Sequence, residues 1–419
     1  MSKKHRMLKN YAKKYTRIWE VSSPECPVFS KLYSSTEKQL KEQHMDRFVQ
    51  SVKAFRKGRN RIKELSAADE YLFFENTRNF FRDALDFEDR EIEMMFSDEM
   101  VDATRAFVNQ ARSFDPALPF GDIFQALRNS WIMFGLQLIM GIPIRLTPSV
   151  FAYSMLYPYT DNLIDDPQIS GLEKLLFSER FRERLSGEPI LPVNATEEII
   201  YKLVEMIEKE FPRNDFQEVF ESLLDIHDAQ TASLRLMEPS DSVSEQEAME
   251  VCMNKGGASV LADGFLVAGK LTEAQMYFLY GYGAYLQMLD DIQDVDDDNQ
   301  SGLKTIFSRD AFVVPLDQKV NKTFWFGEYV MQSLDFLDGQ HIELFKTLIR
   351  RSMHLFVAEA IAQNPDIYSE AYVSAFEKYS LFHFDYVRKL NARFSSYHGF
   401  LVTAAKEISL TDRIEVSME

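Results

Sequence analysis

The chain has 419 residues, 46% of them apolar, which is enough to bury a large core and excludes disorder as its main state. A formal net charge of −18 argues against a nucleic-acid-binding protein, which would need a basic face. Only two cysteines, Cys26 and Cys252, are present, so a disulfide framework is excluded. Together with the lack of a signal peptide and of a long apolar run, they predict a cytoplasmic protein without a transmembrane segment.

Few chain breakers and long periodic runs predict an all-α fold, because there are only 16 glycines and 14 prolines. Residues 1–115 are charged, carry apolar residues at helical spacing and form a predicted N-terminal helical extension. The basic first residues leave peripheral contact with an anionic membrane open. After a linker at 116–120, a helix from Gly121 to Ile142 is apolar nearly all round. Such a helix needs neighbours on every side, as at the centre of a large bundle.

The first acidic segment follows an apolar helix that begins at Pro148. Asp161 and Asp165 are four residues apart and share a helix face, and Asp166 comes directly before a proline. Carboxylates at a helix C-terminus oppose the helix dipole, so this unfavourable placement suggests a function such as metal binding. The alternative is an acidic cap and turn.

Three features between residues 170 and 260 have two interpretations each. The first feature is a set of three arginines, Arg180, Arg182 and Arg184. They either close over an anion or lie on a solvated helix face. His227 and Gln230 share a helix face, and a lone histidine is more often structural than a ligand. Gly256 and Gly257 cost about 1 kcal/mol each in a helix interior, so a second helix or a ligand should approach closely there. Lys255 beside them could bind a diphosphate.

The second acidic segment ends a helix over residues 271–289 and places six aspartates within residues 290–298. Asp290, Asp294 and Asp298 are four residues apart and form a ladder on one helix face, with Asp291 beside it. Like charges at this spacing repel, and Mg²⁺, which takes carboxylate oxygens together with substrate phosphates, would hold them. The aromatic residues of this helix are either a wall that stabilises a carbocation or ordinary core: Tyr277, Phe278, Tyr280, Tyr282 and Tyr285.

The alternatives to a magnesium site are a solvated acidic helix end and a calcium-binding loop. The calcium loop pattern fails, because Asn299 stands at its glycine position and Thr305 at its closing glutamate. Lys304 and Arg309 follow the ladder and supply cations within reach of a metal-bound phosphate.

The pair of acidic segments resembles the two metal motifs of class I isoprenoid-diphosphate enzymes, which include trans-prenyltransferases, squalene and phytoene synthase-like enzymes and class I terpene synthases. The resemblance implies a helical bundle with a central cavity over residues 116–405 and a tail over 406–419. It implies about three Mg²⁺ ions on the residues Asp161, Asp165, Asp166, Asp290, Asp291, Asp294 and Asp298. Of these residues, the resemblance implies that four are catalytic: Asp161, Asp165, Asp290 and Asp294. It assigns the diphosphate to Lys255, Lys304, Arg309 and Gln230.

Two departures from the family pattern bear on the reaction. No basic segment for a second substrate precedes Asp161, and the first motif lacks the aspartate that usually opens it. Both favour Mg²⁺-dependent ionisation of one linear prenyl diphosphate to an allylic cation, which gives a terpene hydrocarbon or alcohol plus diphosphate. A chain-elongating or squalene/phytoene synthase-like prenyltransferase is the alternative enzyme, and an acidic helical scaffold that binds divalent cations is the non-enzyme alternative. Chain length, product skeleton and a homodimer are left open.

Overall fold

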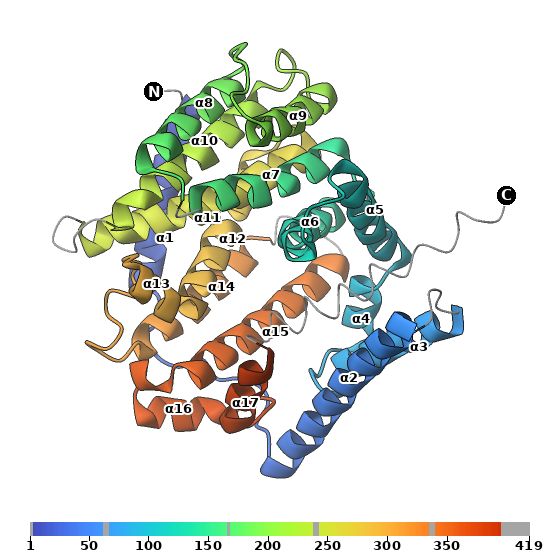
Figure 1. The fold of residues 1–419 in the computed structure, drawn as a ribbon. Coiled ribbons are helices and arrows are strands. Elements are labelled where there is room, and N and C mark those ends of the chain that lie inside the picture. The colour runs from blue at the N-terminus through green and yellow to red at the C-terminus, as the bar shows by residue number, and fades with distance from the viewer. Residues whose placement is uncertain (1–2, 62–66, 166–167, 238–242, 335–339, 395–419) are drawn as a thin grey trace. The chain divides into compact units, whose positions relative to one another are not determined.

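The computed structural model describes residues 3–61, 67–165, 168–237, 243–334 and 340–394. Within these ranges the secondary structure is helical throughout and contains no strand, which confirms the predicted all-α class (Figure 1). None of the described helices is both long and apolar enough to cross a bilayer.

The chain divides into two compact units, each built from two separate stretches of sequence. The first unit comprises Met1–Pro27 and Gln125–Ile342, and the second comprises Val28–Phe124 and Glu343–Glu419. The continuous division expected from the sequence, at residues 115 and 405, stays a prediction, because compactness does not show which segments fold alone. The expected tail over 406–419 lies outside the described residues.

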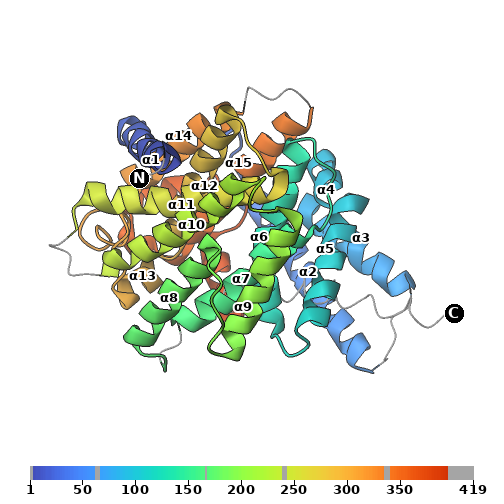
Figure 2. The same cartoon turned by 90° about the horizontal axis from the view of Figure 1, so that it is seen from above.

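The first unit is a bundle in which α11 lies between α12 and α10 (Figures 1 and 2). Its helices are α1 (Lys3–Val21), most of α6 (Phe120–Ile139), α7 (Pro148–Asp165), α8 (Gly171–Ser186), α9 (Ala195–Glu210), α10 (Gln217–Ser233), the 3-10 turn η1 (Leu234–Met237), α11 (Glu245–Ala268), α12 (Glu273–Gln293), α13 (Val295–Ser301) and α14 (Asp317–Gln332). Nearly every residue of α11 from Gly256 to Leu266 is buried, as this central position requires. The apolar helix α6, which was expected to need neighbours on every side, instead leaves Trp131 exposed.

Glycines set the close approach of α11 and α12. A Cβ atom on Gly256 would lie 2.3 Å from the carbonyl oxygen of Gly283, and a Cβ on Gly283 would lie 2.1 Å from that of Gly256. At Gly257 a Cβ would lie 2.6 Å from the ring of Tyr280. Helix packing therefore accounts for the paired glycines that the sequence left open between a helix and a ligand.

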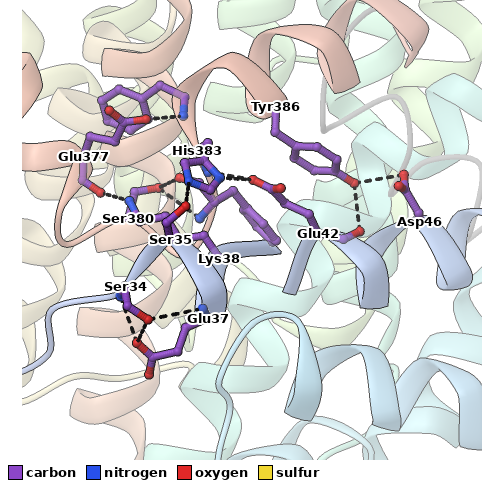
Figure 3. A network of polar contacts seen from close by, with 12 residues as sticks. Ser34, Ser35, Glu37, Lys38, Glu42, Asp46, Glu377, Ser380, His383 and Tyr386 are labelled. Carbon is purple, nitrogen blue, oxygen red and sulfur yellow. Dashed lines mark hydrogen bonds and ion pairs between the residues drawn. The ribbon is translucent and has the colours of Figure 1, made fainter. Parts of the chain in front are cut away.

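The second unit has its own apolar core. Its helices are α2 (Ser35–Arg61), α3 (Ala67–Asp83), α4 (Asp89–Met95), α5 (Asp98–Phe114), most of α15 (Gln340–Gln363), the 3-10 turn η2 (Pro365–Ile367), α16 (Glu370–Glu377) and α17 (Phe384–Phe394). Phe48 and Phe80 stack at its centre, with ring centroids 4.2 Å apart. A network of polar contacts joins the start of α2 to the segment that leads from α16 into α17 (Figure 3).

Candidate metal and diphosphate site

The acidic ladder runs from the end of α12 into α13 through Asp294. The amide of Asp294 donates to the carbonyl of Asp290 at 2.9 Å, and the amide of Asp298 donates to that of Asp294 at 2.8 Å. Four-residue hydrogen bonding therefore continues across the junction, although Asp294 itself leaves helical geometry with φ −93° and ψ 12°. Asp290, Asp294 and Asp298 thus follow one another at one-turn intervals.

Two carboxylates of the second acidic segment have a buried oxygen without a hydrogen-bond partner among the described residues. Asp291 is 5% exposed and accepts a hydrogen bond from Nε2 of Gln287 at 2.8 Å on Oδ1. Its Oδ2, and the Oδ2 of Asp298, are buried and have no hydrogen-bond partner among the described residues. Buried acceptors are nearly always satisfied in folded proteins, so two such oxygens in one cluster are places where a water or a cation can bind.

The electrostatics of the cluster agree with this interpretation. Burial, followed by the charges of Asp291 and Asp294, raises the pKa of Asp298 to about 8. Burial raises the pKa of Asp291 to about 6. Burial and the neighbouring Asp290 raise the pKa of Asp294 to about 6, even though this side chain reaches solvent. The protein therefore places these groups where their charged forms are unfavourable unless a cation lies close by.

One predicted diphosphate ligand lies beside the ladder. Lys255 on α11 lowers the pKa of both Asp291 and Asp298 through its positive charge, and the thiol of Cys252, one turn earlier, donates a hydrogen bond to Asp291. The packing of α11 against α12 that the glycines permit is what brings Lys255 to the aspartates. A lysine next to crowded carboxylates can stabilise, through its positive charge, an anion that metal ions hold there.

The other predicted diphosphate ligands occupy three different settings. The amide of Lys304 donates to the carbonyl of Leu236 at 2.8 Å, so the loop after α13 is fixed against η1. Nη1 of Arg309 donates to the carbonyl of Val243 at 2.6 Å, which ties the guanidinium to the residue before the N-cap of α11. Gln230 lines a cavity instead of the ladder.

This cavity lies between α7, α8 and α10. Its lining is mostly apolar and aromatic: Tyr153, Leu156, Tyr157, Thr160, Phe181, Leu185, Leu223, Ile226, His227 and Gln230. About 30 Å³ is open to the centres of water-sized molecules, which holds one or two waters and no long hydrocarbon. His227 is buried in this wall, and burial lowers its pKa.

The first acidic segment follows directly on the part of α7 that lines the cavity. Thr160, which lines the cavity, comes directly before Asp161. The hydroxyl of Tyr157 lies 2.9 Å from Oγ of Ser259 on α11, one turn beyond Lys255. The helix that carries the first acidic segment is therefore packed on the helix that carries the cation of the second.

The side chains of Asp161 and Asp165, and all of Asp166, lie outside the described residues. Among the side chains that the structure does describe, no three of the Cys, His, Asp or Glu type surround a common point closely enough to hold an ion. The convergence of the two segments on one metal cluster thus stays a prediction.

Two sequence interpretations gain an answer from the packing. The arginines of α8 are held by carboxylates in pairs: Arg180 with Glu197, Arg182 with Asp228, and Arg184 with Glu208. The aromatic residues of α12 point to several neighbours. Tyr277 and Tyr280 stack on Tyr15 of α1, with centroids 4.9 and 5.9 Å away. These two rings are core packing between helices.

Sequence reasoning missed a buried polar cluster deep in the first unit. Asp263 on α11 is 0% exposed, and its Oδ1 accepts a hydrogen bond from Nδ2 of Asn129 at 3.2 Å. Asn129 also donates to Ser154 at 3.2 Å. The only signal in the sequence is an isolated aspartate within a long apolar run, and its partners lie on other helices.

Comparison with protein families, with curated proteins and with solved structures gives no match to this chain.

Proposed function

We propose that the protein is a Mg²⁺-dependent enzyme of the class I isoprenoid-diphosphate type, which ionises a linear prenyl diphosphate in the manner of a terpene synthase. The observation that supports it most is the pair of buried, unpartnered carboxylate oxygens on Asp291 and Asp298 beside Lys255. Carboxylate oxygens that lack donors, next to one cation, suit a site completed by metal ions and an anionic substrate.

The carboxylates of the two acidic segments are of the ligand type that magnesium takes. Hard cations of this kind take oxygen ligands and keep waters and phosphates in their remaining positions. The proposed ligands are Asp290, Asp291, Asp294 and Asp298 from the second segment and Asp161, Asp165 and Asp166 from the first. Bound Mg²⁺ would neutralise the charge that develops on the leaving diphosphate.

The chain's own side chains would do three things. Lys255 would place a positive charge beside the diphosphate, and Lys304, Arg309 and Gln230 are proposed as further contacts. The aromatic and aliphatic lining of the cavity would keep water away from the allylic cation. Because the cavity has room for one or two waters only, binding of a prenyl chain must widen it by moving the surrounding side chains.

The test uses the purified full-length protein with Mg²⁺ and prenyl diphosphates of ten to twenty-five carbons. We expect release of inorganic diphosphate together with a hydrocarbon or alcohol, detected by mass spectrometry. The same incubations with isopentenyl diphosphate separate the alternative enzyme, since a chain-elongating transferase consumes it. No turnover with any chain length would count against the proposal, and cation binding without turnover would favour the scaffold.

Matched variants locate the activity. Asp290→Ala should abolish turnover, whereas Asp296→Asn removes one carboxyl charge from the same segment on a different helix face and should leave most of it. Mg²⁺-dependent thermal stabilisation gives a second readout that does not need a substrate. Full activity and full stabilisation in Asp290→Ala would overturn the assignment of the ladder.

A further inference from the structure

The second unit contains a serine, a histidine and a glutamate joined in series. Oγ of Ser35 lies 3.0 Å from Nε2 of His383, and Nδ1 of the same ring lies 2.8 Å from Oε1 of Glu42 (Figure 3). Both contacts are hydrogen bonds, and each uses a different nitrogen of the imidazole. This order of groups is the one that converts a serine hydroxyl into a nucleophile.

The local sequence explains the geometry. Ser35 and Glu42 are seven residues apart on α2, which is about two helical turns, so they share a face. His383 directly precedes α17, and its amide donates to the same Oε1 of Glu42 at 2.9 Å. The hydroxyl of Tyr386 lies 3.2 Å from the carbonyl of Glu42, which holds α17 against α2. The carboxylate is therefore fixed by both the backbone and the ring of the histidine.

The hydrogen bonds determine the tautomer of the imidazole. A carboxylate only accepts hydrogen bonds, so Nδ1 of His383 must carry the proton that points to Glu42. In the neutral ring, Nε2 then presents its lone pair to Ser35, whose hydroxyl donates. Exposure follows the same order, because Ser35 is exposed, the ring of His383 is 32% exposed and Glu42 is 15% exposed. The nucleophile faces solvent and the orienting acid faces the protein.

The start of α2 supplies donors for a developing negative charge. Ser35 is the first residue of this helix, and the amides of Glu37 and Lys38 are already used by Oγ and the carbonyl of Ser34, at 3.3 and 3.0 Å. The amides of Ser35 and Thr36 precede the first bonds within the helix and point out of its N-terminus. The positive end of the helix dipole acts at the same place.

We propose that Ser35, His383 and Glu42 form a second active site, an esterase-type centre that cleaves uncharged acyl esters. Oγ of Ser35 forms a bond to the acyl carbon while its proton passes to Nε2 of His383. The ester C–O bond then breaks, and the alcohol leaves with that proton. Water cleaves the acyl-serine in the same two stages and releases the carboxylic acid. Glu37 and Glu377 lie in the same polar network and outnumber its one buried cation, Lys38, so the local charge disfavours acyl groups that carry a negative charge (Figure 3).

This inference does not depend on the acidic ladder, since all three residues belong to the second unit. The competing interpretation is that the hydrogen bonds only fasten α2 to α17. The two interpretations differ in the reactivity of position 35, which can be measured without knowing the natural substrate.

The first experiment treats the full-length protein with a fluorophosphonate probe and locates the label by mass spectrometry, with p-nitrophenyl acetate hydrolysis measured in parallel. We expect the label on Ser35 and an initial burst of p-nitrophenol. Ser35→Ala should lose both and keep its fold, because the side chain is exposed and hydrogen-bonds to His383 at the protein surface. His383→Gln should slow hydrolysis by roughly a hundredfold to ten-thousandfold.

The second experiment replaces Ser35 by cysteine in a Cys26→Ser background, since Cys26 is exposed and Cys252 is buried. A histidine partner stabilises a thiolate, so iodoacetamide should alkylate Ser35→Cys well below the usual thiol pKa of about 8.5. Adding His383→Gln to this variant should restore ordinary pH dependence. Equal pH profiles with and without His383, together with an unlabelled Ser35, would show a structural fastening only and overturn the proposal.

Discussion

Substitution of Asp263 by asparagine should stabilise the protein, and the gain should depend on pH in a defined way. The carboxyl is 0% exposed, its Oδ2 has no hydrogen-bond partner among the described residues, and a single donor from Asn129 reaches Oδ1. Burial raises its pKa from 3.8 to about 8, against the smaller lowering effect of Asn129. The fold therefore favours the neutral acid.

The sign and size of the effect follow from this raised pKa. An acid whose pKa is higher in the folded state costs nothing below the unfolded pKa, and its cost grows as the pH rises towards the folded pKa. Each tenfold increase in the proton affinity of the carboxyl on folding corresponds to about 1.4 kcal/mol, so the total cost above pH 8 is on the order of 5 kcal/mol. Asparagine has no such charge to bury, and its carbonyl can accept the same hydrogen bond from Asn129.

The assay is urea denaturation of wild type and Asp263→Asn, followed by circular dichroism at several pH values between about 5 and 9. The difference in the free energy of unfolding between Asp263→Asn and wild type should increase by up to about 1.4 kcal/mol per pH unit and level off near pH 8. Asp366→Asn, which removes an exposed carboxyl, is the control for loss of charge alone. A difference that stays constant with pH would refute the account of this buried acid.

Three further predictions test other parts of the structure. Gly256→Ala should destabilise by about 1–3 kcal/mol or more, because the new Cβ meets the backbone of α12, whereas Gly171→Ala has open space and should change the thermal midpoint little. Burial lowers the pKa of His354 to about 4, so the free energy of unfolding of the wild type should fall by up to about 3 kcal/mol as the pH drops from 6.5 to 4. Denaturant titrations of His354→Leu should not show this loss. Arg180→Gln leaves Glu197, 0% exposed, without its ion pair and should cost about 3–5 kcal/mol by urea denaturation without weakening Mg²⁺ binding.

The sequence was sufficient for those features that depend on neighbours along the chain. Scarce glycine and proline with periodic apolar residues predicted the helices, and four-residue spacing predicted that Asp290, Asp294 and Asp298 follow one another at one-turn intervals. Backbone hydrogen bonding maintains that register even though Asp294 leaves helical geometry.

Features that depend on distant segments could not be predicted. A glycine in a helix looks the same whether a helix or a ligand approaches it, so only the packing of Gly256 against Gly283 identified the neighbour. Nothing in the spacing of Ser35 and His383, which are 348 residues apart, indicates that they meet. The division into two units from interleaved stretches has the same cause, because local patterns do not specify which helices pair.

The most direct test of the central proposal is Mg²⁺-dependent binding of inorganic diphosphate, measured by isothermal titration calorimetry. The set comprises wild type, Asp161→Asn, Asp290→Asn and the double variant, with Asp296→Asn as the control. If the two acidic segments hold one metal cluster, each single variant should lose most of the binding, and the double variant should be little worse than either. Unchanged binding in Asp161→Asn, or losses that simply add, would contradict a shared site.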